Sequence, residues 1–365
     1  MTQSNYNRRQ WLIHAAGWTA SAALASVFSG GGAARAATGG ARSRVIIDTD
    51  PGVDDAMAIL LALRSPELQV EAITPVAGNV PLELTLPNAL RLLEIAGRGD
   101  IPVAAGAREP LKRQLVTAAY VHGNNGLAGV EFPAPKLKPV AESAASLIRR
   151  MVRQSPGEIS IIALGPLTNV AQAFSDDPRL PAQVRDITIM GGSLSGGNIT
   201  PAAEFNSYVD PEAAQIVYAS GARITMVGLD VTRKAHMTEE HIGALEAAKN
   251  PSGRAAGRIM RATLEQVQRT GGNNGILLVH DAMAVATRID PSLVTLEEMH
   301  IEVETQGERT AGETLGYRKA PMHRSAPLHG AQPPAEDTAF HPNAKVAVNV
   351  DAPRFLQFLI GRLTG

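Results

Sequence analysis

VIIDTDPGVDD, residues 45–55, joins a run of three β-branched residues to four aspartates, with Pro51 and Gly52 between them. The apolar run predicts a short buried strand, and the Pro-Gly pair predicts the turn that ends it. Residues 54–65, DDAMAILLALRS, then place apolar side chains at helical spacing, with two acids in the first turn. A strand that turns into a helix leaves its last side chains at the carboxyl edge of a sheet, where open α/β folds bind ligands.

The four aspartates of this stretch are Asp48, Asp50, Asp54 and Asp55. Carboxylates crowded at one edge of a sheet repel one another unless a cation lies among them. The alternative interpretation is a solvated acidic helix cap, because aspartate is common at helix starts. Four acids flanking one apolar strand favour the cation site over the cap.

The composition excludes several classes of function. The chain has 365 residues, a net charge of −1, 44% hydrophobic residues and no cysteine. This length is sufficient for one large α/β domain or for two smaller ones. Near-neutral charge and 4% aromatic residues argue against an electrostatic or stacking surface for nucleic acid. The absence of cysteine excludes disulfides, thiolate catalysis and cysteine-bound zinc.

The N-terminus predicts export. Residues 8–9 are Arg-Arg, an Ala/Gly/Ser-rich apolar segment follows, and residues 34–36 (ARA) have the small-x-small pattern of a cleavage site. This arrangement resembles a bacterial twin-arginine signal. A membrane anchor is disfavoured because polar and glycine residues interrupt the short apolar run at 17–21. We therefore assign residues 1–36 to a signal peptide that is removed, and we expect a periplasmic mature protein.

Strand-like and helix-like segments alternate after residue 44, which predicts an open, mostly parallel sheet flanked by helices, a Rossmann-like α/β fold. The expected strands cover residues 45–47, 70–76, 102–105, 159–164, 187–190, 224–229 and 346–350. The expected helices cover residues 54–65, 84–96, 142–154, 167–174, 213–219, 238–248, 252–269 and 352–363. Residues 307–336, rich in Gly, Pro, His and Arg, predict a long loop or irregular hairpin. Because no linker interrupts the alternation, residues 44–365 are assigned to a single domain.

Polar residues follow the expected strands at points where the connecting loops should emerge on the same edge of the sheet. They are Asp48, Asp50, Asp54, Asp55, Asn79, His122, the Leu164 carbonyl, Asn198, Glu204, Asn206, His280 and Asp281. Carboxylate, amide and carbonyl oxygens without cysteine suit Ca²⁺ or Mg²⁺ rather than zinc. Such a cation orients a water and lowers its pKa. The remaining amides and carboxylates suit the vicinal hydroxyls of a sugar or polyol.

Structural roles are the alternatives at several of these positions. His280 either donates a proton to a leaving group or packs at the start of the apolar helix that follows it. His122, in a Gly/Asn-rich loop, either contacts a ligand or is solvated. Turn or surface positions are the alternative for Asn79, Asn198, Glu204 and Asn206.

Eight motifs in order resemble those of the inosine–uridine-type nucleoside hydrolases, which are calcium-dependent N-ribohydrolases. They are DTDPGVDDA (48–56), VAGN (76–79), HGNNGL (122–127), LGPLTN (164–169), MGG (190–192), NITPAAEFNSYVDPEAA (198–214), VGLDVT (227–232) and VHDAMAVA (279–286). Their order and spacing hold over the chain from about residue 44 to its end. One such motif is weak evidence, whereas eight in order are highly specific.

The resemblance implies hydrolysis of the N-glycosidic bond of ribonucleosides to free base and ribose. Asp50, Asp55, Asp281 and the Leu164 carbonyl would bind Ca²⁺, and Asp50 would take a proton from the metal-bound water. The expected transition state is oxocarbenium-like, with inversion at the anomeric carbon. His280 would serve the leaving base, and relatives suggest a homodimer or homotetramer.

The resemblance also implies the substrate contacts. The ribose 2′- and 3′-hydroxyls would be held by Asp54, Asn79 and Asp281, with Asn206 as a further ribose ligand. Asn198 and Glu204 would contact the 5′-hydroxyl, and Met190 would pack near the sugar. His122 and His280 would face the base, and Asp48 would support the other acids.

Two departures from the family pattern concern the base. Asn125 stands where many members carry an acid, and residues 271–278 contain no aromatic residue, although many relatives stack one on the base nearby. Base preference is therefore not carried over, although His280 favours the histidine-bearing, broad or inosine–uridine-preferring type.

Two other functions remain as alternatives. A non-catalytic periplasmic nucleoside- or sugar-binding protein is disfavoured by the complete set of acids. A phosphatase of the DxD type, suggested by Asp48-Thr49-Asp50, is disfavoured because the downstream lysine and second acidic motif are missing.

Overall fold

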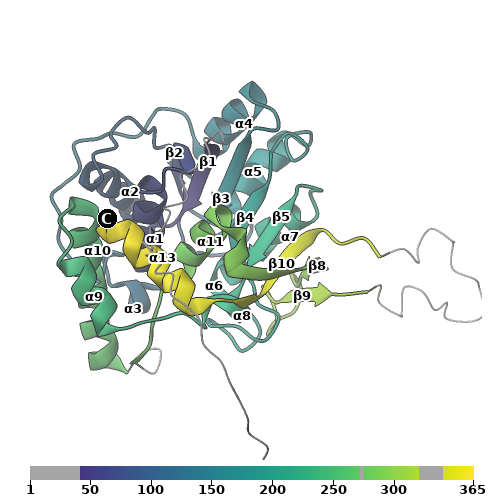
Figure 1. The fold of residues 1–365 in the computed structure, drawn as a ribbon. Helices are drawn as coiled ribbons and strands as arrows, with labels where there is room; N and C mark the ends of the chain where they lie inside the picture. Colours follow the sequence, from purple (N-terminus) through teal and green to yellow (C-terminus); the bar gives the residue numbers. More distant parts are fainter. Residues whose placement is uncertain (1–41, 272–274, 320–339) are drawn as a thin grey trace, which may run out of the picture. The chain divides into compact units, whose positions relative to one another are not determined.

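The computed structural model describes residues 42–271, 275–319 and 340–365, and its central feature is an eight-stranded sheet (Figure 1). The strands are β1 (Ser43–Thr49), β2 (Leu68–Pro75), β3 (Ile159–Ala163), β4 (Ile187–Met190), β5 (Ile224–Val227), β8 (Val294–Val303), β9 (Thr314–Tyr317) and β10 (Ala344–Val350). They lie in the order β2-β1-β3-β4-β5-β10-β8-β9. Pairing is parallel from β2 to β10 and antiparallel at β8 and β9. The predicted α/β fold with a mostly parallel sheet is confirmed.

Helices connect and cover the strands. They are α1 (Val53–Leu63), α2 (Leu82–Ile95), α3 (Ala119–His122), α4 (Ala144–Gln154), α5 (Thr168–Asp176), α6 (Phe205–Val209), α7 (Pro211–Tyr218), α8 (Leu229–Thr232), α9 (Glu239–Glu246), α10 (Pro251–Thr270), α11 (His280–Ile289) and α13 (Ala352–Thr364). A second, two-stranded sheet pairs β6 (His236–Met237) with β7 (Leu277–Leu278). This ribbon ends just before α11, where His280 and Asp281 begin the helix.

Alternation along β1 divides the buried side chains between two cores. Val45 and Ile47 belong to the cluster that contains α1, α10, α11 and α13, whereas Ile46 belongs to the cluster that contains α4, α5 and α7. Successive side chains of a strand point to opposite faces, so a strand covered on both faces is apolar throughout. The β-branched run before the aspartates is therefore buried on both faces of the sheet.

Helix α1 is buried on all sides, which explains its almost continuous apolar sequence. Residues 56–61 have no exposed surface, because α10, α11 and α13 pack against the helix. Such a helix cannot shift without opening the core. The two acids of its first turn, Asp54 and Asp55, are thereby held at the end of β1.

Some local predictions differ from the structure. Residues 102–105, predicted as a strand, form only isolated bridges, Ile73 with Val103 and Ala104 with Val140. Strand β8 was not predicted. It forms a hairpin with β9, and β9 lies within residues 307–336, where a long loop or an irregular hairpin was predicted. The remainder of that loop from residue 320 on lies outside the described residues, as does the predicted signal at 1–36.

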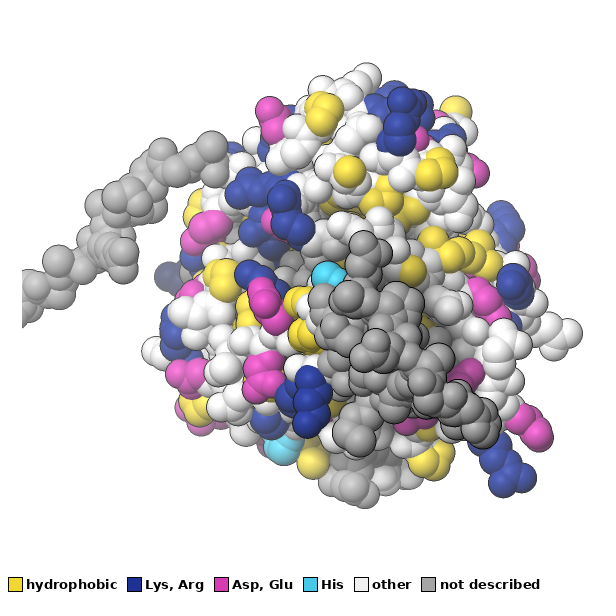
Figure 2. Space-filling model, turned by 90° about the vertical axis from the view of Figure 1, so that its right-hand side faces the viewer, with side chains coloured by type: hydrophobic (Ala, Val, Ile, Leu, Met, Phe, Trp, Pro, Cys, Tyr) yellow, Lys and Arg dark blue, Asp and Glu magenta, His cyan; other side chains and the backbone are white. Residues whose placement is uncertain are grey.

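The surface carries charges of both signs, as the net charge of −1 predicts. Figure 2 shows Lys and Arg side chains interspersed with Asp and Glu over the described part of one face. In the described part of the chain, no helix combines the length and the hydropathy that a membrane span needs.

Candidate active site

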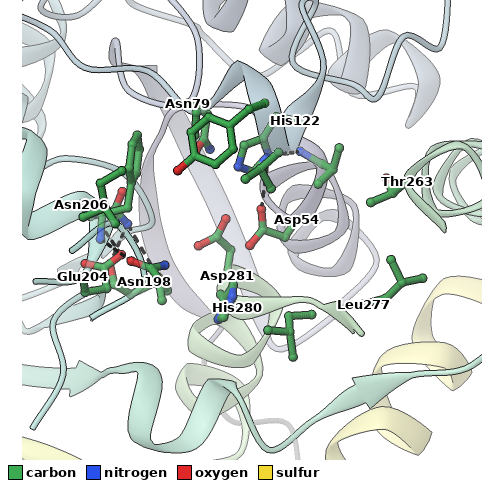
Figure 3. Close-up of a pocket in the computed structure, with 18 of the residues that line it drawn as sticks. Asp54, Asn79, His122, Asn198, Glu204, Asn206, Thr263, Leu277, His280 and Asp281 are labelled. Carbon is green, nitrogen blue, oxygen red and sulfur yellow. Dashed lines mark hydrogen bonds and ion pairs between the residues drawn. The ribbon is translucent and has the colours of Figure 1, made fainter. Parts of the chain in front are cut away.

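A cavity of about 440 Å³ lies at the carboxyl ends of the parallel strands. Its lining includes all the residues predicted to contact substrate, which are Asp54, Asn79, His122, Met190, Asn198, Glu204, Asn206, His280 and Asp281, together with Leu164. Figure 3 shows Asn198, Glu204 and Asn206 on one side of this cavity, and Thr263 and Leu277 on the opposite side. Asp54 and Asp281 lie between the two sides.

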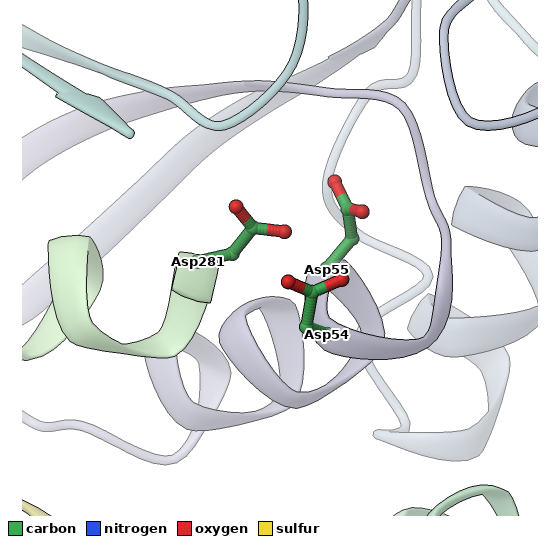
Figure 4. Close-up of side chains that lie close together, drawn as sticks. All are labelled: Asp54, Asp55 and Asp281. Atoms are coloured by element: carbon green, nitrogen blue, oxygen red, sulfur yellow. The ribbon is translucent and has the colours of Figure 1, made fainter. Parts of the chain in front are cut away.

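Three buried aspartates meet at the floor of the cavity. Asp54 and Asp55 from α1 and Asp281 from α11 each offer a carboxylate oxygen, and these oxygens lie within 4.8 Å of one another (Figure 4). Burial, followed by the charges of Asp54, Asp55 and Asp50, raises the pKa of Asp281 well above its ordinary value. Burial, followed by the charge of Asp55, raises the pKa of Asp54 to about 6. Electrostatic repulsion on this scale is relieved by a cation among the carboxylates.

Asp50 lies behind the cavity wall with no exposed surface. The Asn79 backbone N–H donates to its Oδ2 at 2.7 Å, whereas its Oδ1 is buried without a hydrogen-bond partner among the described residues. Burial and the charge of Asp55 raise the pKa of Asp50 well above its ordinary value. An unpartnered buried carboxylate oxygen is costly unless a proton or a ligand satisfies it.

Two glycines make room for the Asp50 carboxylate. A Cβ added at Gly165 would lie 2.5 Å from Oδ1, and one added at Gly78 would overlap Oδ2. Neither glycine has the left-handed backbone that L residues avoid, so close approach alone requires a residue without a side chain. Gly165 directly follows Leu164, and Gly78 directly precedes Asn79. The glycines of the two predicted motifs therefore have a common function.

Asp55 is held by donors from its own loop and from Asn79. Its Oδ1 accepts from the Thr49 hydroxyl at 2.5 Å, and its Oδ2 accepts from the Gly52 N–H at 3.0 Å and from Asn79 Nδ2 at 2.9 Å. These contacts fix the orientation of the carboxylate before any ligand binds. Asn79 thus orients both Asp50 and Asp55, in addition to lining the cavity.

The donor set fits a hard divalent cation. It consists of the three carboxylates, and the unpartnered Oδ1 of Asp50 and the Leu164 carbonyl are further oxygens of the site. Ca²⁺ and Mg²⁺ prefer such oxygen ligands. Asp54, predicted to face the ribose, belongs to the group whose oxygens converge, whereas Asp50, predicted as a ligand, does not. The Leu164 carbonyl accepts a hydrogen bond from Asn206 Nδ2 at 2.7 Å, which leaves it a second lone pair.

Asp48 lies in a polar network beneath the site. Its Oδ2 accepts from the Thr74 hydroxyl at 2.6 Å and from Asn169 Nδ2 at 2.9 Å. Burial raises the pKa of Asp48 to about 7, against the effect of these two hydrogen bonds. Because Asp48 is fully buried and does not line the cavity, it has the position of a supporting residue.

Both predicted histidines line the cavity. The Val53 N–H donates to Nδ1 of His122 at 3.1 Å, and burial lowers the pKa of His122 to about 4. The proton of the neutral ring is therefore on Nε2. Nδ1 of His280 lies 2.7 Å from the Thr232 hydroxyl, and burial lowers the pKa of His280 despite the nearby charge of Asp54.

Backbone donors organise the side that carries Glu204. This residue caps α6 and accepts from the N–H groups of Asn206 at 3.0 Å, Ser207 at 3.2 Å and Gly192 at 2.9 Å. Burial raises the pKa of Glu204 to about 6. Asn198 Oδ1 accepts from the Phe205 N–H at 2.8 Å, and its Nδ2 donates to no other described residue. One free amide donor therefore faces a sugar-sized cavity.

Sequence reasoning missed the wall formed by α3 and α10. Tyr120, Thr263 and Gln266 line the cavity but follow no strand. The polar residues at helical spacing on the α10 face were the available signal. Asn125, in contrast, organises its own loop. Its Oδ1 accepts from the N–H groups of Leu127 and Gly129, and it does not line the cavity.

Comparisons with known proteins agree over most of the chain. The family model described as inosine-uridine preferring nucleoside hydrolase matches residues 45–357. The pyrimidine-specific ribonucleoside hydrolase RihA of Citrobacter koseri is 43% identical over 321 residues, which cover 87% of this chain and 97% of that protein. A solved plant nucleoside hydrolase has a TM-score of 0.80 and 38% identity, covering 88% of this chain and 99% of its own. The purine-preferring ribonucleoside hydrolase of Gardnerella vaginalis has a TM-score of 0.78 and 32% identity, covering 88% and 98%.

Proposed function

The chain belongs to the inosine-uridine preferring nucleoside hydrolase family and is a nucleoside hydrolase, and we propose that it splits ribonucleosides into base and ribose at a Ca²⁺ site formed by its buried aspartates. One observation carries the proposal. The converging carboxylate oxygens of Asp54, Asp55 and Asp281 lie beside a cavity. One side of this cavity carries Asn198, Glu204 and Asn206, and the opposite side carries Thr263 and Leu277 (Figure 3). Asp50, with one unpartnered oxygen, completes the set.

The cation would orient a water and lower its pKa when bound at these carboxylates. Asp50 would accept the proton of that water, because its buried Oδ1 has no other donor among the described residues. Gly78 and Gly165 leave space for the carboxylate, and the Asn79 N–H holds its Oδ2. A water held at this site would add to the anomeric carbon on the face opposite the base, and the configuration would invert.

The carboxylates also stabilise the sugar. Cleavage of an N-glycosidic bond develops positive charge on the ribose ring, and nearby negative groups lower the energy of that state. Asp54, Asn79 and Asp281 hold the 2′- and 3′-hydroxyls, and Asn206 is a further ribose ligand. Asn198 donates from its free Nδ2 to the 5′-hydroxyl, and Glu204 lies beside it.

His280 is the group that protonates the leaving base. Its Nδ1 is engaged with Thr232, so Nε2 is the nitrogen that serves the substrate. The lowered pKa of His280 makes its protonated form scarce but strongly acidic. His122, whose Nε2 carries a proton in the neutral ring, donates a hydrogen bond at the same end of the cavity.

A turnover assay on uridine and inosine, with and without Ca²⁺, tests the function. Both substrates are needed because similar relatives include a pyrimidine-specific and a purine-preferring enzyme. We expect Ca²⁺-dependent release of base, loss of turnover in Asp50→Ala, and normal turnover in Asp100→Ala, which removes an exposed aspartate away from the cavity. Tight nucleoside binding without turnover would select a binding protein, and release of phosphate from a phosphoester would select a phosphatase.

The proposal includes export to the periplasm. The family match begins at residue 45, so the twin-arginine-like segment precedes the catalytic region. We expect N-terminal sequencing of the periplasmic protein to begin near residue 37, and Arg8→Lys combined with Arg9→Lys to retain the protein in the cytoplasm. A cytosolic protein with intact residues 1–36 would refute export. The proposed homodimer or homotetramer is tested by light scattering on the purified protein.

A further inference from the structure

Asn198 lies at the edge of the cavity on a loop without regular structure. Residues 191–204, which connect β4 to α6, contain no helix or strand, and Asn198 itself is exposed. Its Oδ1 accepts from the Phe205 N–H at 2.8 Å, and its Nδ2 is the donor proposed for the 5′-hydroxyl. An exposed side chain with one hydrogen bond is held mainly by the backbone that carries it. The position of this donor therefore depends on what holds the loop.

The short helix α8 holds the first half of the loop. The Leu229 N–H donates to the Gly192 carbonyl oxygen at 3.0 Å. The Asp230 carboxylate accepts from the Leu194 N–H at 2.8 Å and from the Ser195 hydroxyl at 2.6 Å. The loop is thus attached to one helical turn at three of its residues.

Arg233 holds the second half of the loop. Its Nη1 donates to the Gly196 carbonyl oxygen at 3.2 Å, and its Nη2 donates to the carbonyl oxygen of Gly197. Two adjacent carbonyls suit a guanidinium group, whose N–H donors form a rigid fork. Arg233 follows Asp230 by three residues, so the two side chains project from the same face of the turn. Among the described residues that line the cavity, Arg233 is the only Lys or Arg.

We propose that Arg233 is a positioning residue that sets the preference of this enzyme for nucleosides with a 5′-hydroxyl. Gly197 directly precedes Asn198, so the guanidinium holds the peptide from which the Asn198 side chain reaches the ribose. Hydrogen bonds inside the loop, such as that from the Asn198 N–H to the Ala203 carbonyl oxygen at 3.1 Å, shape the turn. Arg233 adds the contact to a separate helix that fixes where the turn lies. This inference rests on the proposed function, because it requires Asn198 to meet the 5′-hydroxyl.

Kinetics on uridine and 5′-deoxyuridine test the assignment, because 5′-deoxyuridine lacks only the group that Asn198 would contact. Arg233→Met keeps an unbranched side chain but removes both donors. We expect the ratio of kcat/KM for uridine to kcat/KM for 5′-deoxyuridine to fall about tenfold, which corresponds to loss of one hydrogen bond to a bound substrate. Arg233→Lys keeps the charge and one donor group, so it should lower the ratio by a smaller factor, and it serves if the methionine variant folds poorly.

Arg254→Met is the matched control. Arg254 also donates to two adjacent carbonyl oxygens, those of Ala248 and Lys249, but it does not line the cavity. We expect this variant to keep the wild-type ratio of the two kcat/KM values. A fall as large as that of Arg233→Met would show that the ratio responds to general loss of stability, and the proposal would be overturned.

The ratio also separates the loop from the leaving-group end of the cavity. Burial and, to a smaller extent, the charge of Arg233 lower the pKa of His280, against the charge of Asp54. A change at His280 acts on both nucleosides alike, because both release the same base. Such a change therefore cancels in the ratio, whereas a displaced Asn198 does not.

A double-mutant cycle with Asn198→Asp identifies the residue through which Arg233 acts. We expect the double variant to have the ratio of Asn198→Asp alone, because the donor that Arg233 positions is already absent. Multiplicative effects of the two substitutions on the ratio would overturn the proposal. If the wild-type enzyme releases no base, the proposed function itself fails. If it releases base and folded Arg233 variants keep the wild-type ratio, the inference alone fails.

Discussion

The hydroxyl oxygen of Thr232 lies 2.7 Å from Nδ1 of His280. Thr232 ends α8 and His280 begins α11, so the contact joins two segments 48 residues apart. Thr232 is fully buried, so its hydroxyl cannot turn to solvent. The contact fixes the imidazole ring so that one nitrogen is engaged with the protein and the other remains for the substrate.

We expect Thr232→Val to lower kcat on uridine about tenfold, because loss of the hydroxyl frees the His280 ring. His280→Ala should lower it further. Both variants should spare an activated p-nitrophenyl riboside, whose leaving group needs no proton, and Thr232→Ser should restore the activity. Equal losses on uridine and on the activated substrate would contradict the leaving-group role.

Asp281→Asn removes one of three crowded carboxylates. The folded-state pKa of Asp281 is raised, so its ionisation destabilises the metal-free protein as pH rises above the ordinary value of about 4. We expect this variant to have a higher Tm than wild type without metal at about pH 8, with a smaller difference at about pH 5. Ca²⁺ should raise the Tm of wild type only. An equal Ca²⁺ shift in the variant, measured by scanning fluorimetry, would argue against the site.

Gly165→Ala tests the space around Asp50. The new Cβ would lie 2.5 Å from Oδ1, so the carboxylate must move, and we expect a loss of about 1–3 kcal/mol in unfolding free energy. Turnover should fall by a larger factor than the stability alone accounts for. Gly243→Ala in α9 is the control, because no atom lies within 4 Å of its Cβ and alanine favours helix. Urea unfolding and initial rates on the same preparations measure both effects.

Asn198→Asp tests the contact to the 5′-hydroxyl. The aspartate keeps an oxygen for the Phe205 N–H but lacks the Nδ2 donor. We expect kcat/KM for uridine to fall about tenfold, which corresponds to loss of one hydrogen bond to a bound substrate. The value for 5′-deoxyuridine should change little. A similar fall for both nucleosides would show that the substitution disturbs the loop instead.

His122 gives a pH prediction. Its folded pKa of about 4 lies below the ordinary value of 6.5, so the unfolded chain binds the proton more tightly. The contribution of His122 to stability is therefore complete above about pH 6.5 and is lost as pH falls through that range toward 4. We expect ¹⁵N NMR to find the neutral ring with its proton on Nε2 at pH 6. A charged ring at that pH would be inconsistent with the Val53 contact.

The strand–turn–helix unit at residues 45–63 was predictable because β-branched residues, a Pro-Gly turn and helical spacing agree locally. Strand β8 was not, because its sequence VTLEEMHIEV carries three glutamates. The prediction assumed strands buried on both faces, whereas β8 is half exposed and antiparallel. Helices α3, α6 and α8 have four or five residues, too few to show a helical period.

The residues of the site likewise fall into a group that the sequence predicted and a group that it did not. Asp54, Asn79 and Asp281 were found because they follow apolar strands, and parallel strands bring such residues to one edge. Tyr120 and Gln266 were not found because their place depends on how α3 and α10 pack against each other. That contact is long-range, and the polar residues at helical spacing on α10 do not show by themselves which segment that face packs against.

Strand β10 has a consequence for biosynthesis. It is formed by residues 344–350, yet it lies between β5 and β8 in the middle of the sheet order. A growing chain on the ribosome cannot close the sheet until residues 344–350 have been added. Until then β5 presents an unpaired edge, which is a template for aggregation. Closure of the sheet therefore waits for the synthesis of residues 344–350, and chains truncated before residue 344 should leave the β5 edge open.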